Sequence, residues 1–216
     1  MLFRSPWQTG TLTLRQLEDV LRQAKDVGTV DSIYFEGGEP FLYYPVLLKA
    51  VQSAKSWGFE VGIVSNGYWA TNLEDAIEWL KPFSGKLVDL SVSSDLFHYS
   101  KELSRQAQNA SQAARELGIP IGTITIAQPD SVDVECAVGQ LPPDESGVMY
   151  RGRAAEKLAH QVALQPWSEF SDCPYEDLRE PGRVHLDPLG NLHICQGISI
   201  GNLFERPLKE IGRAHV

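Results

Sequence analysis

The sequence predicts an α/β protein built on a parallel sheet, because helical and strand patterns alternate regularly over residues 13–126. The helical segments carry apolar residues at a spacing of three and four, and the strand segments are short apolar or aromatic runs. Most of these runs end in glycine, serine or a carboxylate. Such an alternation with short turns is typical of βαβ units, whose strands lie parallel in one sheet.

The expected elements begin with a helix and then alternate. In chain order they are a helix over residues 13–28, a strand over 32–36, a helix over 46–57, a strand over 61–64, a helix over 71–81, a strand over 87–92, a helix over 100–117 and a strand over 119–126. Thr13 with Gln16, and Thr71 with Glu74, have the spacing of a capping box, which closes the first turn of a helix. A glycine or a proline follows each helix and marks its end.

The pattern changes in the last third of the chain. Gly147–Tyr150 has the composition of one more strand, and beyond Pro166 prolines, glycines and short strands replace the long helices. Residues 184–194 are expected to form a β-hairpin around a turn that contains proline, glycine and asparagine. We therefore expect one domain over residues 6–165 and a smaller second one over residues 166–211.

Composition limits the classes of function. With 216 residues, of which 43% are hydrophobic, the chain can bury a core of ordinary size. The net charge of −9 and the lack of a basic run argue against nucleic-acid binding. No apolar run is long enough to span a bilayer, and no signal peptide is recognisable. Three scattered cysteines, Cys136, Cys173 and Cys195, do not make a secreted disulfide framework, so a cytoplasmic protein is expected.

The two ends of the chain resemble translated sequencing adapter rather than protein. Residues 1–5 and residues 210–216 both match the translation of a common short-read adapter, although Glu210 and Ile211 could also belong to the protein. We therefore set both ends aside in predicting the fold, and we expect the chain to be an internal piece of a longer protein.

Polar clusters follow successive predicted strands. They are Gly37-Gly38-Glu39-Pro40, Ser65-Asn66-Gly67, Ser93-Ser94-Asp95 and Arg151-Gly152-Arg153. Because the carboxyl ends of parallel strands meet at one edge of a sheet, we expect these clusters to converge there. Gly37 and Gly38 allow a tight turn or the close approach of a ligand, and Pro40 suits the first turn of a following helix. A strand-to-helix turn that happens to use glycine would explain the first cluster equally well.

The ordered set of clusters resembles the radical S-adenosylmethionine (SAM) superfamily over about residues 10–160. The Gly37-Gly38-Glu39-Pro40 cluster looks like the family hallmark, which contacts the amino group of the cofactor's methionine moiety. The resemblance implies an α/β fold of the partial parallel (β/α)6 TIM-like barrel type, here lacking its first strand. The implied cofactor-binding residues are Gly37, Gly38, Glu39, Pro40, Ser65, Asn66, Ser93, Ser94, Asp95 and Arg153.

The chemistry of the cofactor agrees with these residue types. A carboxylate such as Glu39 would bind the methionine ammonium through a charge-assisted hydrogen bond, worth about 1.5–3 kcal/mol. Hydroxyl or amide groups at the ends of the second and third predicted strands would bind a ribose. His98 could join the site or only cap the next helix, and Trp69 could contact the substrate or lie in the core.

One departure from the family pattern limits what this chain can do. The family holds its cleaving [4Fe–4S] cluster with a C-x3-C-x2-C loop, and the sequence has no such loop. We expect truncation to explain the gap: the parent protein would cleave SAM reductively to a 5′-deoxyadenosyl radical that abstracts hydrogen from a substrate, while the chain as given is inactive. The alternative is a non-catalytic binding module that kept the barrel and lost the cluster. An ordinary parallel-barrel lyase or phosphate binder would need a phosphate-binding glycine loop near the last strands, which the sequence lacks.

The C-terminal residues resemble the start of an auxiliary-cluster domain of the SPASM or twitch type. The resemblance rests on Cys173 and on the segment Gly190–Cys195, and it makes Cys173 and Cys195 ligands of a possible auxiliary [4Fe–4S] cluster. Two ordinary buried cysteines are an alternative, and a zinc site with His185 and His193, which can share a face of the hairpin, is another. Related enzymes with such domains often modify peptides or proteins. We therefore expect a peptide or protein substrate, with an electron donor such as flavodoxin or ferredoxin.

Overall fold

The computed structural model describes residues 10–93, 101–126, 145–146, 156, 159–161, 166–169, 177–195 and 198–213. The first elements are α1 (Leu14–Val27), β1 (Ser32–Phe35), the 3-10 helix η1 (Pro40–Tyr43), α2 (Tyr44–Ser56), β2 (Glu60–Ser65), α3 (Leu73–Leu80), the 3-10 helix η2 (Lys81–Phe83), β3 (Asp89–Ser93), α4 (Lys101–Glu116) and β4 (Ile121–Ile126). They are followed by β5 (Glu145–Ser146), the 3-10 helices η4 (Ala159–Gln161) and η5 (Trp167–Glu169), β6 (His185–Leu186), β7 (Asn191–Cys195), β8 (Ile198–Asn202) and α6 (Leu208–Arg213).

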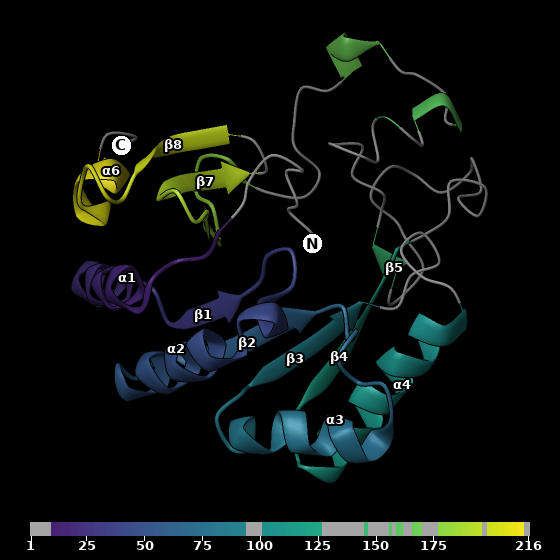
Figure 1. The fold of residues 1–216 in the computed structure, drawn as a ribbon. Coiled ribbons are helices and arrows are strands. Elements are labelled where there is room, and N and C mark those ends of the chain that lie inside the picture. Colours follow the sequence, from purple (N-terminus) through teal and green to yellow (C-terminus); the bar gives the residue numbers. More distant parts are fainter. Residues whose placement is uncertain are drawn as a thin grey trace.

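Strands β1 to β5 form one sheet in which every neighbouring pair is parallel (Figure 1). The strands stand in chain order, β1-β2-β3-β4-β5, and helices α2, α3 and α4 lie in the connections between the first four. The expected α/β class and the parallel sheet are therefore confirmed. A barrel of six βα units stays a prediction, and the strand expected at residues 147–150 lies outside the described residues.

Helix α1 begins and ends as its sequence predicts. The Thr13 hydroxyl accepts a hydrogen bond from the backbone N–H of Gln16 (3.2 Å), and the Gln16 side chain accepts one from the backbone N–H of Thr13 (2.9 Å). The chain leaves the helix at Gly28, whose φ of 81° is a left-handed conformation that suits glycine. Among the residues that the structure describes, neither this helix nor any other is long and apolar enough to cross a membrane.

Helix α3 has a different cap from the one predicted. The capping box expected from Thr71 and Glu74 is wrong, because Asn72 occupies the cap position and its side-chain oxygen accepts a hydrogen bond from the backbone N–H of Asp75 at 2.8 Å. Thr and Asn are both good cap residues, so the local sequence alone does not choose between them. The helix that starts after Asn72 places Leu80 fully inside the core.

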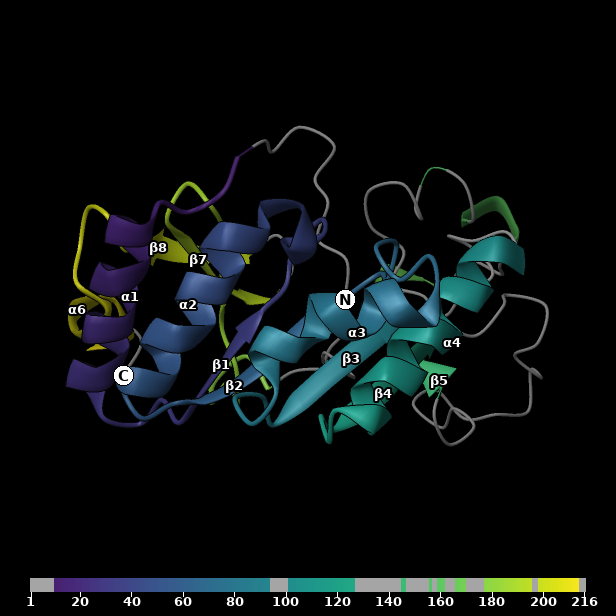
Figure 2. The same cartoon turned by 60° about the horizontal axis from the view of Figure 1, so that its bottom comes forward.

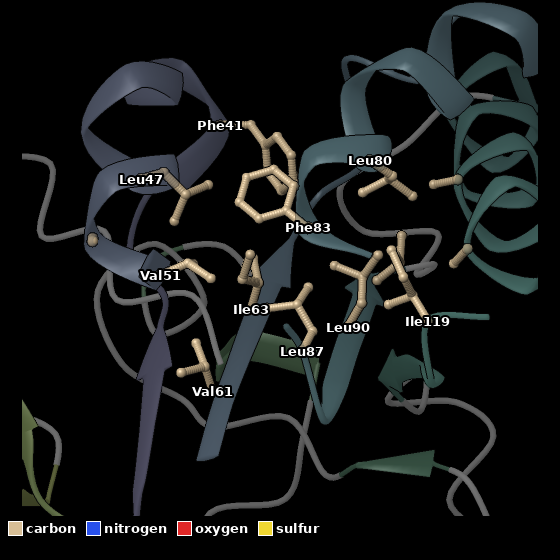
Figure 3. Packing of buried hydrophobic residues seen from close by; sticks show 14 of the residues in the cluster. Phe41, Leu47, Val51, Val61, Ile63, Leu80, Phe83, Leu87, Leu90 and Ile119 are labelled. Atoms are coloured by element: carbon tan, nitrogen blue, oxygen red, sulfur yellow. The ribbon is translucent and has the colours of Figure 1, made fainter. Parts of the chain in front are cut away.

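The main core lies between this sheet and helices α1 to α4, which cover one of its faces (Figure 2). Val61 and Ile63 of β2 and Leu90 of β3 are fully buried on that face (Figure 3). Gly62 points the other way, since successive residues of a strand face opposite sides of the sheet. The ring of Tyr34 lies across Gly62, where any Cβ atom would overlap it. The carboxyl edge of the sheet lies between these two faces.

Strands β6, β7 and β8 form an antiparallel sheet beside α1 (Figure 1). Its core consists of Leu192, Leu203 and Ile211, and Val20 of α1 packs against them. The side chain of Ile211 is 1% exposed, and it fills the space that the missing side chain of Gly201 leaves. The adapter origin of the two ends stays a prediction.

Candidate functional site

The loops that follow β1 and β2 meet at the carboxyl edge of the parallel sheet. The two strands pair in register, with Phe35 opposite Ile63, so the residues after them emerge on the same side. Glu39 stands four residues after the end of β1, and Ser65 and Asn66 stand at the end of β2. Direct hydrogen bonds join Glu39 to both of the latter residues. The structure thus brings together two of the predicted polar clusters.

Glu39 is buried, with 6% of its surface exposed, and its carboxylate accepts three hydrogen bonds. Oε1 accepts from the backbone N–H of Phe41 (3.1 Å) and from the hydroxyl of Ser65 (2.9 Å), and Oε2 accepts from the backbone N–H of Asn66 (2.7 Å). The bond from Phe41 caps η1, which Pro40 opens. An ionised carboxylate has about four acceptor positions. One of them, on Oε2, is therefore left unused by the described part of the chain.

The surroundings of the Glu39 carboxylate favour its protonated form. Burial raises the pKa of Glu39, and the hydrogen bonds from Asn66, Phe41 and Ser65 oppose this effect without cancelling it. Burial also raises the pKa of the half-buried Tyr68, and the charge of Glu39 raises it further, so the phenol lies within electrostatic reach of the carboxylate. A cation that reached Oε2 would relieve the cost of burying this charge.

The Ser65 hydroxyl donates a hydrogen bond to Glu39, and its other hydrogen-bonding positions are filled within the chain. It therefore has no free position for the ribose contact that the sequence suggested. Its Oγ accepts hydrogen bonds from the backbone N–H of Gly67 (3.0 Å) and from the indole N–H of Trp69 (2.9 Å). A hydroxyl has two acceptor positions and one donor position. With both acceptor positions filled, its proton points to Glu39. The side chain is also only 2% exposed.

The backbone beside the carboxylate is open. Gly37 has a φ of 139°, a conformation that favours glycine, and among the described residues other than its chain neighbours no atom lies within 4 Å of the place where its Cβ would be. Gly38 is half-buried and directly precedes Glu39. Asn66 uses its side-chain oxygen to accept a hydrogen bond from the backbone N–H of Tyr68 (2.9 Å), which leaves its side-chain nitrogen for another partner.

Of the remaining predicted cofactor-binding residues, only Ser93 is described, and no hydrogen bond links it to Glu39. Ser93 ends β3, the strand next to β2, and is 4% exposed. The predicted residues that lie outside the described ones are Ser94, Asp95, His98, Arg151, Gly152, Arg153, Cys136 and Cys173.

Trp69 lies in the core, which is one of the two positions expected for it. Its side chain is 3% exposed and stacks on Phe41, with ring centroids 4.5 Å apart and an angle of 25° between the planes. Tyr44, Trp79 and Phe83 pack around the same pair and complete an aromatic cluster. Sequence reasoning missed that this cluster reaches the site through the indole N–H. The one local signal is the position of the tryptophan, four residues after the serine that ends β2.

The C-terminal sheet places a second set of predicted residues. Cys195 is buried at the end of β7. His185 lies directly opposite His193, so the two share a face as expected. Nε2 of His193 lies 3.3 Å from the carboxylate of Asp187, and its Nδ1 is buried and has no hydrogen-bond partner among the described residues. The described residues contain no group of three or more potential metal ligands. The zinc site and the auxiliary cluster both stay predictions.

The fold is a parallel α/β sheet, and a buried carboxylate with an open hydrogen-bond acceptor position lies at the carboxyl ends of its strands. Proteins of this class bind small ligands at that place. Residues 3–134, more than half of the chain, match the Radical SAM superfamily, and the chain therefore belongs to this superfamily.

The chain is also similar to YydG of Bacillus subtilis (strain 168), a protein named for peptide biosynthesis. The two are 23% identical over 113 residues, a stretch that covers 52% of this chain and 35% of YydG. The chain thus spans about a third of the length of this curated relative.

Proposed function

We propose that this chain forms the SAM-binding part of a radical SAM enzyme that acts on a peptide or protein. The observation that carries the proposal is the acceptor position on Oε2 of Glu39 that the described residues leave unused. A buried carboxylate in that state suits a cationic donor such as the ammonium group of the methionine moiety. A neutral donor would gain less, because charge-assisted hydrogen bonds are roughly twice as strong as neutral ones.

The other residues of the site take roles that follow from their positions. The open backbone at Gly37 and Gly38 lets the methionine moiety approach closely, and Pro40 starts the 3-10 helix that fixes the loop. The side-chain nitrogen of Asn66 suits a ribose hydroxyl. Ser93, Ser94, Asp95 and Arg153 are proposed to complete the cofactor site from the following strand ends.

The cleaving cluster would have to be held by residues outside the given sequence, because Cys136, Cys173 and Cys195 do not form the C-x3-C-x2-C pattern. When bound, a reduced [4Fe–4S] cluster supplies the electron that cleaves SAM to methionine and a 5′-deoxyadenosyl radical. We further propose that residues 166–211 begin an auxiliary-cluster domain, in which Cys173 and Cys195 are ligands. The buried position of Cys195 at the end of a strand is compatible with that role.

A peptide or protein substrate is supported by the similarity to YydG, whose name assigns it to peptide biosynthesis. The enzyme would also need a low-potential electron donor, and a flavodoxin or ferredoxin has the required chemistry.

The proposal is tested by titrating SAM into the chain and following the backbone amide signals of Asn66 and Gly67 by NMR. We expect saturable shifts in the wild-type chain. Glu39→Gln removes the charge of the acceptor, so we expect the dissociation constant to rise about 10- to 100-fold, which corresponds to one charge-assisted hydrogen bond.

Glu60→Gln is the matched control, because Glu60 is an exposed carboxylate at the opposite end of β2. This variant should bind SAM as the wild type does. Equal binding by Glu39→Gln and Glu60→Gln, with both variants folded, would refute the assignment of Glu39 to the cofactor.

The lack of the three-cysteine loop in the sequence favours one alternative, a binding module without radical chemistry. The two are separated by amplifying the source DNA beyond both ends of the reading frame. An upstream C-x3-C-x2-C loop, and release of 5′-deoxyadenosine by the reconstituted full-length protein, would support the enzyme. A native upstream segment without these cysteines would leave the binding module.

A further inference from the structure

We propose that Trp69 is a positioning residue, which holds the Glu39 carboxylate through the hydroxyl group of Ser65 so that Oε2 faces the bound ligand. The identity of that ligand as SAM rests on the proposed function. The positioning itself rests on contacts within the chain.

The indole N–H of Trp69 needs a partner because the side chain is buried and stacked on Phe41. An unsatisfied buried donor is costly, and Oγ of Ser65 at 2.9 Å satisfies it. Stacking on the Phe41 ring limits the movement of the indole, so the direction of the N–H group is fixed by packing as well as by the bond.

The bond from Trp69 decides where the Ser65 proton goes. Gly67 already donates its backbone N–H to Oγ, and the indole N–H fills the second acceptor position. The only position left is the donor, and it is directed to Oε1 of Glu39. Without the indole N–H, the hydroxyl could turn away and accept a different donor.

Both donors to Oε1 therefore depend on the same stacked pair. Phe41 donates its backbone N–H directly, and Trp69 acts through Ser65. The pair comes from two different loops, one after β1 and one after β2, and holds Oε1 from both sides. With Oε1 fully occupied, the remaining acceptor position of the carboxylate lies on Oε2.

A purely structural role for Trp69 makes different predictions, and Trp79 offers the matched control. Trp79 belongs to the same aromatic cluster, with its ring centroid 6.0 Å from that of Trp69, and it makes no hydrogen bond to Ser65. Trp69→Phe and Trp79→Phe both remove an indole and keep a stacking ring. Only the first removes the donor to Ser65.

The experiment is an NMR titration of the Glu39 side-chain carboxyl carbon against pH, in the wild type and both variants. Trp69→Phe should raise the pKa of Glu39 above its wild-type value, because the charged form loses part of its hydrogen bonding. Trp79→Phe should leave it unchanged. SAM affinity should fall about three- to tenfold in Trp69→Phe, which corresponds to one neutral hydrogen bond, and not in Trp79→Phe.

Ser65→Ala provides a second test, in which the variant loses only the hydroxyl oxygen that links Trp69 to Glu39. It should raise the pKa of Glu39 as well, and adding Trp69→Phe to it should cause no further rise, since the effect passes through the hydroxyl. Trp69→Phe and Trp79→Phe with the same Glu39 titration would overturn the inference. If the wild-type chain binds no SAM, the proposed function fails, while the Glu39 titrations still decide the role of Trp69.

Discussion

Glu39 and Asp187 are both buried carboxylates that follow a strand, but they differ in how many of their acceptor positions receive a hydrogen bond. Asp187 directly follows β6 and is 9% exposed, close to the 6% of Glu39. Its Oδ1 accepts the backbone N–H groups of Leu189 and Asn191, both at 2.9 Å. Its Oδ2 accepts the side-chain N–H of Asn191 at 2.9 Å and lies 3.3 Å from Nε2 of His193. The turn and the neighbouring strand β7 supply all four of these contacts.

This difference in hydrogen bonding reverses the direction of the pKa shift. Burial raises the pKa of Asp187, but the hydrogen bonds from Asn191, His193 and Leu189 outweigh burial and lower it below its ordinary value. Around Glu39 the balance is opposite, and burial prevails over three hydrogen bonds. A buried carboxylate that its own turn satisfies fixes the turn. One that is left with an open acceptor position can bind a ligand.

The largest effect on stability is expected from Asp187→Ala. The variant removes the charged acceptor of two partly buried backbone N–H groups and of the Asn191 side chain, so we expect the C-terminal sheet to lose about 3 kcal/mol. Amide hydrogen exchange measures this loss residue by residue. Protection should fall in β7 and stay unchanged in β2, and equal loss in both strands would show that the two sheets unfold together.

A smaller effect on stability is expected from replacing the glycines of the two turns, Gly190 and Gly37, with alanine. Both have a positive φ, of 91° and 139°, so alanine strains the backbone at either position. At Gly190 an added Cβ would also overlap the ring of Phe204 and lie 2.7 Å from Oδ1 of Asn202, whereas at Gly37 no atom of the other described residues, apart from its chain neighbours, is within 4 Å. We expect Gly190→Ala to cost about 2–3 kcal/mol and Gly37→Ala about 1 kcal/mol.

Urea unfolding of the two variants checks this order. Gly37→Ala should in addition weaken SAM binding, because its methyl group would enter the space left open for the ligand. A Gly37→Ala variant that is less stable than Gly190→Ala would contradict the view that the first turn is built around a ligand and the second around its own side chains.

The parts of the fold that local sequence determines could be predicted. The capping box of Thr13 and Gln16 and the apolar runs of the parallel strands are short-range patterns, and the structure contains them. The turn at Gly37 and Gly38, directly before Glu39, is also a short-range pattern that the sequence shows. The choice of Asn72 over Thr71 was not predictable, because both residue types are good caps and the two stand next to each other in the sequence.

The hydrogen bonds of the site depend on residues distant in sequence and could not be predicted. Trp69 stacks on Phe41, 28 positions earlier, and no periodicity links the two. The same residue type after a strand end would equally suit a substrate contact. The hydrogen bonds of Ser65 could not be predicted for the same reason. Only the positions of Gly67 and Trp69 in the structure show that both acceptor positions of its hydroxyl are filled.

The smallest expected effect is a difference in how the two turns respond to pH. The ordinary pKa of Glu39 is 4.5, and its folded value is higher. Between these values the folded chain keeps a proton that the unfolded chain releases, so the local stability around Glu39 falls as pH rises through this window. The folded pKa of Asp187 lies below its ordinary 3.8. Its contribution is therefore complete above pH 3.8 and is lost as pH falls through the folded value.

Lowering the pH from 7 to 4.5 should thus raise the opening free energy at the amide of Asn66 and leave that of Asn191 unchanged, as measured by native-state hydrogen exchange. Glu39→Gln should abolish the first trend, because a neutral side chain has no proton to gain. Below pH 3.8 the opening free energy should fall at Asn191 and show no further change at Asn66, which would confirm that the pKa values of the two carboxylates are shifted in opposite directions. A parallel response would mean that burial acts alike on both, and that the open position at Oε2 does not set Glu39 apart.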